Sequence, residues 1–293
     1  LNFYSRDLDK FNSITFNEAN QNIKFAVHAI EEFNDSTLLV GTHQNGLLKL
    51  NKNDYSFKRV NYKSNNSISS LLINSIVKTE DEKFIVGTNQ GLMTFDPYNS
   101  TLQLTKFDLN DKYETVESSI ESILIDNNKT LWLGTSSKGL IKITNTDDSY
   151  KIQNLMITNK RVLSLSLKQD GNILCGTEND GLFEISNEKN EIENYKFDKN
   201  IQDGIKSNSI WSTYTDEKNR IWLGYYNNGI DVYNENYNKF KSLRSISGYS
   251  NSLSSSSVTG IIKDDKDRLW ISTTEGGIDA VSYTHLTLPT NRE

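Results

Sequence analysis

The side chains that most often carry catalysis or bind metals are scarce in this chain of 293 residues. It has three histidines, His28, His43 and His285, and a single cysteine, Cys175. We find no His-Glu-x-x-His or Cys-x-x-Cys metal pattern, no Gly-x-Ser-x-Gly nucleophile and no phosphate-binding glycine loop. Acidic turns at 216–218 and 264–267 lack the spacing of a calcium loop, and we expect solvated turn residues there. The sequence therefore predicts no catalytic residue, no metal site and no cofactor.

Neutral polar and aromatic residues are more plentiful, and they gather in short segments that precede a glycine. These segments contain amides, hydroxyls and the tyrosine pair Tyr225 and Tyr226. Amides and hydroxyls can exchange hydrogen bonds with the hydroxyl groups of a ligand, and an aromatic ring offers an apolar surface with a polar edge. Such a set suits a neutral, hydroxyl-rich ligand such as a carbohydrate. The alternative is that exposed turns simply contain polar residues.

The segments recur because the chain contains six copies of one pattern. Each copy has an apolar pair, Gly-Thr or a variant, a short polar segment, a second glycine and another apolar run, as in LWLGTSSKGLIKI from Leu131. The anchors of the copies are Gly41, Gly87, Gly134, Gly176, Gly224 and Ser272. Successive anchors lie 42 to 48 residues apart. A period in the forties made of strand-like segments is typical of β-propeller blades.

Each repeat can be divided into four strands, A to D in chain order. In the fourth copy we expect them at 162–167, 173–177, 182–186 and 192–197, with Asp170-Gly171 in a tight turn between A and B. The predicted fold is therefore all-β: a β-propeller of four-stranded antiparallel blades, with five full repeats and a partial blade at each end.

The two ends of the chain do not coincide with blade boundaries. Residues 1–17 resemble strands C and D of a preceding blade, and the last copy ends near Val281 in its third strand. We therefore expect residues 1–281 to be a propeller domain that is a fragment of a larger propeller region. Residues 282–293 break the pattern and are expected to be a non-native tail, the alternative being a genuine outer strand.

Comparison of the copies separates packing positions from variable ones. The residue two before each anchor is always large and apolar, and the residue twelve before is always small. We expect the large residues to fill the space between sheets and the small ones to relieve crowding of the innermost strands. The residue thirteen before the anchor varies freely, from His28 to Asn74, Glu121 and Trp211. Packing does not fix this position, so it is a candidate to line the axial channel.

The loops between strands B and C also vary, and an antiparallel meander places all of them on one face. Binding residues are often found on variable loops that a rigid scaffold carries. We therefore predict a ligand-binding face without catalytic residues. Its candidate residues are His28, Asn74, Glu121, Trp211, His43, Asn45, Asn89, Lys138, Asn179, Tyr225, Tyr226 and Asn227.

Composition limits the possible partners. With 32 basic and 38 acidic residues the net charge is −6, and no basic face suggests a nucleic-acid partner. No run of about 18 apolar residues marks a membrane span in this part of the protein. The single cysteine excludes an intrachain disulfide, and we expect Cys175 to be a small buried apolar residue.

Two segments, IESILIDNNKTLWLGTSSKGLIKI from Ile120 and IWSTYTDEKNRIWLGYYNNGIDVY from Ile210, resemble the repeat of the two-component regulator propeller family. The resemblance extends over residues 1 to about 281, and departs from the pattern at Ser272 and Tyr225. It implies a non-catalytic periplasmic ectodomain of a sensor histidine kinase in the inner membrane, which detects glycan fragments. It also implies a homodimer formed through the parent protein.

Two other functions remain open at this stage. Streptogramin-lyase propellers are similar to this repeat class and need a metal and a catalytic histidine, for which only His28 and His43 could serve. Both histidines come from one blade, a poor arrangement for general acid–base catalysis. The third possibility is a scaffold for protein interactions, which would bind a protein partner and no saccharide.

Overall fold

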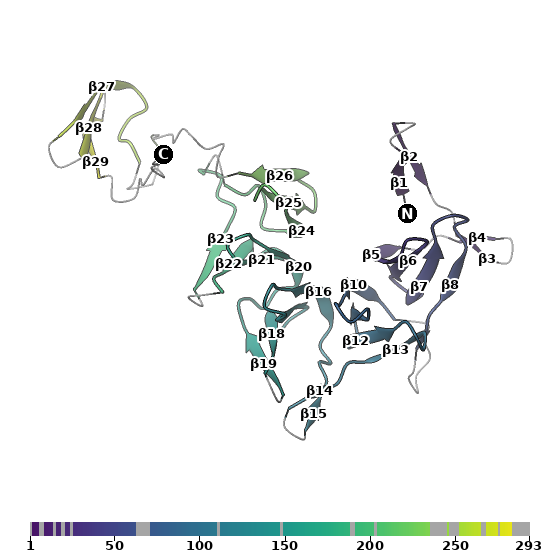
Figure 1. Ribbon diagram of the computed structural model, residues 1–293. Helices are drawn as coiled ribbons and strands as arrows, with labels where there is room; N and C mark the ends of the chain where they lie inside the picture. The colour runs from purple at the N-terminus through teal and green to yellow at the C-terminus, as the bar shows by residue number, and fades with distance from the viewer. Residues whose placement is uncertain are drawn as a thin grey trace, which may run out of the picture. The chain divides into compact units, whose positions relative to one another are not determined.

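The computed structural model describes residues 2–5, 9–13, 16–18, 21–23, 26–62, 71–109, 112–146, 149–187, 191–201, 204–234, 245, 252–264, 268–274 and 276–282. All regular elements among these residues are strands (Figure 1). No helix in this described part is long and apolar enough to cross a membrane. The chain divides into two compact units, residues 1–233 and 234–293, which are described separately.

The first unit contains the first four complete blades. Blade 1 consists of β5 (Val27–Asn34), β6 (Thr37–Thr42), β7 (Leu47–Asn51) and β8 (Phe57–Arg59). Blade 2 consists of β10 (Ile73–Lys78), β11 (Phe84–Thr88), β12 (Gly91–Asp96) and β13 (Thr101–Leu104). Blade 3 consists of β16 (Ile120–Ile125), β17 (Leu131–Thr135), β18 (Leu140–Asn145) and β19 (Tyr150–Leu155). Blade 4 consists of β20 (Val162–Leu167), β21 (Ile173–Thr177), β22 (Leu182–Ile185) and β23 (Ile192–Tyr195).

Each of these blades is an antiparallel meander, because consecutive strands pair in sequence order. Blade 2 has one unexpected strand, β9 (Asn61–Tyr62), which pairs in parallel with β13 at its outer edge. The predicted strands of blade 4 agree with the structure, except that the third ends one residue early and the fourth two residues early. The four-stranded antiparallel blades are confirmed, whereas the total number of blades stays a prediction.

The remaining strands form smaller sheets. Blade 5 shows β24 (Ile210–Thr215), β25 (Ile221–Tyr225) and β26 (Ile230–Tyr233), and a hairpin of β14 (Phe107–Asp108) and β15 (Tyr113–Glu114) follows blade 2. Near the N-terminus, β1 (Asn2–Ser5) pairs with β2 (Lys10–Ser13), and β3 (Phe16–Glu18) with β4 (Gln21–Ile23). The second unit contains blade 6, with β27 (Val258–Lys263), β28 (Arg268–Thr273) and β29 (Gly277–Ser282).

The predicted tail falls almost entirely outside the described residues. Its first residue, Ser282, pairs with Arg268 as the end of β29, so the strand extends one residue further than expected. Residues 283–293 are not described. Whether the tail is native therefore stays a prediction.

The core of the first unit lies between successive blades. Strand A of each blade contacts strand A of the next, from β5 to β10, β16, β20 and β24. Phe84, Val86 and Phe95 of blade 2 pack with Leu39 and Leu47 of blade 1. The large apolar residues two before the anchors are buried at Leu39, Trp132 and Leu174, as predicted. Each blade thus completes the hydrophobic core of its neighbour.

The glycine anchors allow this close approach. A Cβ atom added at Gly134 would lie 2.6 Å from the backbone oxygen of Val162 in the next blade, and it would also collide with the Ser122 hydroxyl. The Ser122 hydroxyl itself donates a hydrogen bond of 2.9 Å to that same Val162 oxygen. The small residues twelve before the anchor therefore occupy a crowded position, as the sequence comparison predicts.

The A–B turn of blade 3 is closed by one buried carboxylate. Asp126 accepts hydrogen bonds from the backbone N–H groups of Asn128 and Thr130, each at 2.9 Å. Its other oxygen accepts the indole N–H of Trp132, also at 2.9 Å. Asp216 with Trp222 and Asp264 with Trp270 repeat this bond, at 3.0 and 2.9 Å. The expectation of solvated turn residues at Asp216 and Asp264 was therefore wrong, because both carboxylates hold a tryptophan of strand B.

Cys175 is fully buried in the core between blades 3 and 4, beside Trp132 and Phe183. Burial raises the pKa of its thiol well above the usual range. Because the thiolate is the reactive form, we expect iodoacetamide to leave Cys175 unmodified in the folded chain and to alkylate it in denaturant. Mass spectrometry of both samples measures this. Complete alkylation of folded protein at the rate seen in denaturant would contradict it.

Candidate functional site

The B–C loops, where most candidate residues lie, are built by the Gly-Thr pair. Where the pair is present, the threonine hydroxyl donates to the carbonyl of the loop glycine, at 2.8 Å from Thr42 to Gly46 and at 2.8 Å from Thr135 to Gly139. The φ angles of Gly46 and Gly139 are 64° and 67°, in a region that favours glycine. The recurring Gly-Thr and loop glycine are thus explained by the turn itself.

Backbone hydrogen bonds place each B–C loop beside the residue that precedes strand A. The N–H of His43 donates to the carbonyl of Ala26 at 2.9 Å, and that of Glu178 to the carbonyl of Arg161 at 3.0 Å. Successive blades are also linked here, since the N–H of Gly46 donates to the carbonyl of Leu71 at 3.2 Å. The loops and the starts of the innermost strands therefore share one edge of each blade, as the antiparallel topology predicts.

Blade 5 brings two candidate residues into an exposed aromatic pair. Trp211 comes from strand A and Tyr226 from the B–C loop. Their rings stack with centroids 4.9 Å apart and planes inclined by 28°. Trp211 is 48% exposed and Tyr226 is 62% exposed. Stacked rings with open surface can contact an apolar ligand face, while the indole N–H and the phenol can form hydrogen bonds.

Tyr225 does not contribute to this aromatic surface, and its prediction as an aromatic platform was wrong. Its side chain is only 8% exposed. Its hydroxyl donates to Asp231 at 2.8 Å and accepts the backbone N–H of Lys206 at 3.1 Å. Burial, together with the bond to the Asp231 carboxylate, raises the pKa of Tyr225. This tyrosine replaces the usual threonine and becomes part of the core.

Asn74 and Glu121 are also committed to the scaffold. The amide of Asn74 donates to the carbonyl of Ile120 in the next blade at 2.9 Å. Glu121 is 7% exposed and forms a 2.7 Å ion pair with Arg161 of the next blade. That hydrogen bond raises the pKa of Arg161 above its ordinary value. Both side chains join neighbouring blades, and sequence spacing gave no sign of the Arg161 partner.

Blade 1 brings His28 and His43 together, with ring centroids 5.3 Å apart. Both side chains are exposed. The described residues contain no group of three or more histidine, cysteine, aspartate or glutamate side chains that could hold a metal. The two exposed rings can offer hydrogen bonds and ring contacts to a ligand.

The other candidates occupy loop positions with different roles. The side-chain oxygen of Asn89 accepts the backbone N–H of Leu72 at 3.1 Å, and Asn179 has a φ of 67° in its turn. Asn45 is half-buried, and its backbone N–H donates to Thr42 at 2.9 Å. Lys138 and Asn227 are exposed. Exposed candidates are thus found in each of blades 1 to 5.

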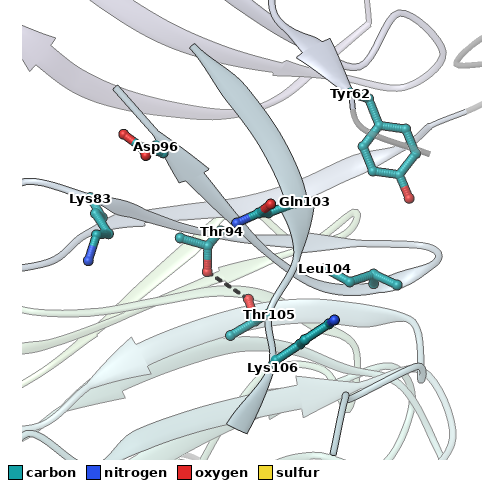
Figure 2. Close-up of a pocket in the computed structure, with 8 residues that line it drawn as sticks. All are labelled: Tyr62, Lys83, Thr94, Asp96, Gln103, Leu104, Thr105 and Lys106. Atoms are coloured by element: carbon teal, nitrogen blue, oxygen red, sulfur yellow. Dashed lines mark hydrogen bonds between the residues drawn. The ribbon is translucent and has the colours of Figure 1, made fainter. Parts of the chain in front are cut away.

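A groove that the sequence did not predict lies on the outer strands of blade 2. It has a volume of about 630 Å³, and its lining includes Thr94, Gln103, Thr105 and Lys106. Figure 2 shows the hydroxyls of Thr94 and Thr105 joined by a hydrogen bond of 2.8 Å, with Lys83 on one side and Tyr62 on the other. None of these residues belongs to the B–C loops.

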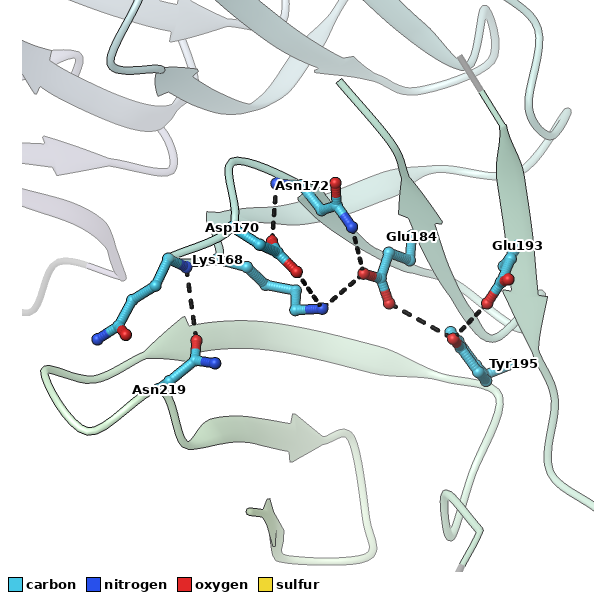
Figure 3. A network of polar contacts seen from close by, with 8 residues as sticks. Lys168, Asp170, Asn172, Glu184, Glu193, Tyr195 and Asn219 are labelled. Atoms are coloured by element: carbon cyan, nitrogen blue, oxygen red, sulfur yellow. Dashed lines mark hydrogen bonds and ion pairs between the residues drawn. The ribbon is translucent and has the colours of Figure 1, made fainter. Parts of the chain in front are cut away.

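Blade 4 contains a polar network centred on the buried Lys168 (Figure 3). Its ammonium group forms ion pairs with Glu184 at 2.6 Å and Asp170 at 3.0 Å. Burial lowers the pKa of Lys168, but the two carboxylates outweigh it and the pKa is raised. Asn172 and Tyr195 donate further hydrogen bonds to Glu184. The charges are paired within the blade, which indicates a structural role.

Two segments of the chain match a known family of propeller repeats. Residues 204–227 and 252–275 match the family model described as two component regulator propeller. These residues lie in the fifth and sixth repeats. Two repeats of this β-propeller chain thus match the two-component regulator propeller, and the predicted resemblance is confirmed.

Individual relatives are similar to this chain over most of its length. The curated histidine kinase P4 of Formosa agariphila is 25% identical over 68% of this chain and 16% of its own length. The extracellular domain of a putative hybrid two-component system from B. thetaiotaomicron is 21% identical, with a TM-score of 0.63 over 96% of this chain and 42% of that one. PorZ of Porphyromonas gingivalis, a surface component of the type-IX secretion system, is 14% identical, with a TM-score of 0.52 over 85% of this chain and 38% of its own.

These likenesses establish the propeller fold. The chain spans less than half the length of each of these proteins. What the whole protein senses, and what it passes a signal to, is therefore a matter for proposal.

Proposed function

We propose that this chain is part of the ligand-sensing ectodomain of a membrane sensor histidine kinase, and that it recognises a carbohydrate. The proposed location is the periplasm, and the proposed working form is a homodimer through the parent protein. The repeat family and the extracellular domain from B. thetaiotaomicron support the sensor class. The propeller binds, and the catalytic step belongs to a kinase domain elsewhere in the parent protein.

The stacked pair of Trp211 and Tyr226 carries the carbohydrate part of this proposal. The apolar face of a pyranose ring can lie on an aromatic ring, while its hydroxyls exchange hydrogen bonds with amides and hydroxyls nearby. The exposed Asn227 adjoins Tyr226 in the same loop and can supply such bonds. A neutral oligosaccharide fits this surface, because both members of the pair are uncharged.

Signalling requires that the bound ligand favour one of two states of the protein. A ligand can shift an equilibrium only by the difference between its affinities for the two states. A carbohydrate held by blade 5 would therefore have to contact a second surface whose position differs between the states. The partner protomer or a neighbouring domain of the parent protein would provide that surface.

Replacement of Trp211 by alanine is expected to weaken binding of neutral oligosaccharides at least about tenfold, which corresponds to about 1.4 kcal/mol. A glycan array of neutral oligosaccharides identifies the ligand, and isothermal titration calorimetry then compares the variants. Tyr214→Ala is the matched control, since Tyr214 is an exposed aromatic residue on the same strand. Equal affinities of the wild type and Trp211→Ala, or no binding to any neutral oligosaccharide, would reject the proposed site.

A further inference from the structure

We propose that the groove on blade 2 is a second binding site, for an oligosaccharide that carries a uronic acid carboxylate. This inference goes beyond the proposed function, because the groove shares no residue with the aromatic pair of blade 5. Three observations support it: the short side chain of Thr94, the polar groups that line the groove, and the positive charge of Lys106.

The groove is open where blade 2 has a short side chain and blades 1, 3 and 4 have a long one. The strand C residue that pairs with the position two before the anchor is Lys49 in blade 1, Lys142 in blade 3 and Glu184 in blade 4. In blade 2 the same position is Thr94, which pairs with Ile85. A threonine is several atoms shorter than any of these residues.

The longer residues show what fills this space in blades 1, 3 and 4. The ammonium group of Lys49 lies 5.1 Å from the ring centroid of Phe95 in blade 2 and donates to Ser100 at 3.1 Å, so it occupies the gap between two blades. Lys142 covers the Trp132 ring at 4.7 Å, and Glu184 is bound to Lys168. Thr94 instead turns to Thr105, at 2.8 Å, and leaves the space in front of it empty.

The groups that line the groove suit a hydroxyl-rich ligand. Gln103 offers an amide, Tyr62 offers a phenol and a ring face, and Thr94 and Thr105 offer further acceptor positions. Within the described residues, the side chains of Gln103 and Tyr62 have no hydrogen-bonding partner. The volume of about 630 Å³ is within the range of small-molecule sites.

The positive charge of Lys106 favours a hydroxyl-rich ligand that also carries a carboxylate. Lys83 is neutralised by Asp81 at 2.7 Å, and Asp96 accepts the backbone N–H of Tyr98 at 2.8 Å in its own turn. Lys106 is exposed and forms no ion pair with any described residue. A ligand carboxylate that reaches Lys106 would gain a charge-assisted hydrogen bond. Hydroxyls along the groove and one carboxylate at Lys106 together describe a uronate-containing oligosaccharide.

The test uses the whole chain and a glycan array of uronate-containing oligosaccharides, each printed beside its carboxyl-reduced, neutral counterpart. Binding to uronates is expected, with about tenfold weaker binding to the reduced forms. The informative variant is Thr94→Lys, which places in blade 2 the residue that blades 1 and 3 already carry. It should weaken uronate binding at least about tenfold by filling the groove, although it adds a positive charge.

Lys106→Gln is the second variant and should also weaken uronate binding about tenfold, without filling the groove. Lys58→Gln, which removes an exposed charge from strand D of blade 1, should leave binding unchanged. Binding of neutral oligosaccharides at the aromatic pair of blade 5 should be unchanged in Thr94→Lys, which separates failure of this site from failure of the aromatic pair. Absence of uronate binding, or full uronate binding by Thr94→Lys and Lys106→Gln, would overturn the inference.

Discussion

Replacement of Asp126 by alanine is expected to lower the free energy of unfolding by about 3 kcal/mol, because it removes a buried charged acceptor from three donors. The carboxylate is 5% exposed, and it accepts two backbone N–H groups of its turn and the indole N–H of Trp132. Without it, the indole nitrogen would stay in the core with no acceptor. Urea denaturation followed by tryptophan fluorescence measures the change.

Asn127→Ala is the matched control, since Asn127 is exposed in the same turn. It should change the stability by less than about 0.5 kcal/mol, as surface substitutions usually do. Asp126→Asn should fall between the two, because the amide oxygen retains part of the acceptor function. If Asp126→Ala were as stable as Asn127→Ala, the carboxylate would not be what closes the turn.

Gly134→Ala is expected to destabilise the chain by a similar amount, about 3 kcal/mol, for a steric reason. The new Cβ would lie 2.6 Å from the Val162 backbone oxygen, which is held by strand β20 and cannot move alone. Blades 3 and 4 would have to separate slightly, and the hydrogen bond from Ser122 to the same oxygen would be disturbed. A lower melting temperature in differential scanning calorimetry would report this loss.

Gly204→Ala provides the comparison, because its added Cβ would come no closer than 3.0 Å to a neighbour, the Ile201 side chain. That side chain can adjust, so the melting temperature should change little. Gly134→Ala and Gly204→Ala give up the same backbone freedom in the unfolded state, and their difference isolates the contact between blades. Equal melting temperatures would show that the anchor glycine is not required by packing.

Much of the fold could be predicted because one blade repeats many times in the sequence. Local alternation of apolar residues fixed the strands of blade 4 to within two residues, and the anchor spacing identified the repeat. The parallel strand β9 was missed because its partner, β13, follows about forty residues later and its two residues carry no pattern.

The candidate site could be predicted less well, because the partners of its side chains come from the next blade. Glu121 is paired with Arg161, forty positions along the chain, and Asn74 with Ile120, forty-six positions along. No local motif reports such a contact. Trp211 and Tyr226 could be named from sequence as variable positions, but their stacking depends on the hairpin that brings strand A beside the B–C loop.

The groove on blade 2 was missed for a related reason. Thr94 is visibly smaller than Lys49 or Lys142 in the aligned repeats, yet a short side chain matters only if nothing else fills the space. The strand register and the bond between Thr94 and Thr105 settle that point. Sequence comparison can find such positions once the register is known.

The hydrogen bonds between innermost strands have a mechanical consequence. Asn74 bonds the backbone of β16, and Ser122 bonds the backbone of β20, so adjacent blades are cross-linked near their inner edges. Sliding of one inner strand along its neighbour would break a bond whose partners have little water to replace it. Adjacent blades can therefore move apart more easily at their outer strands than at their inner strands. A force applied to one loop is passed on to the whole blade.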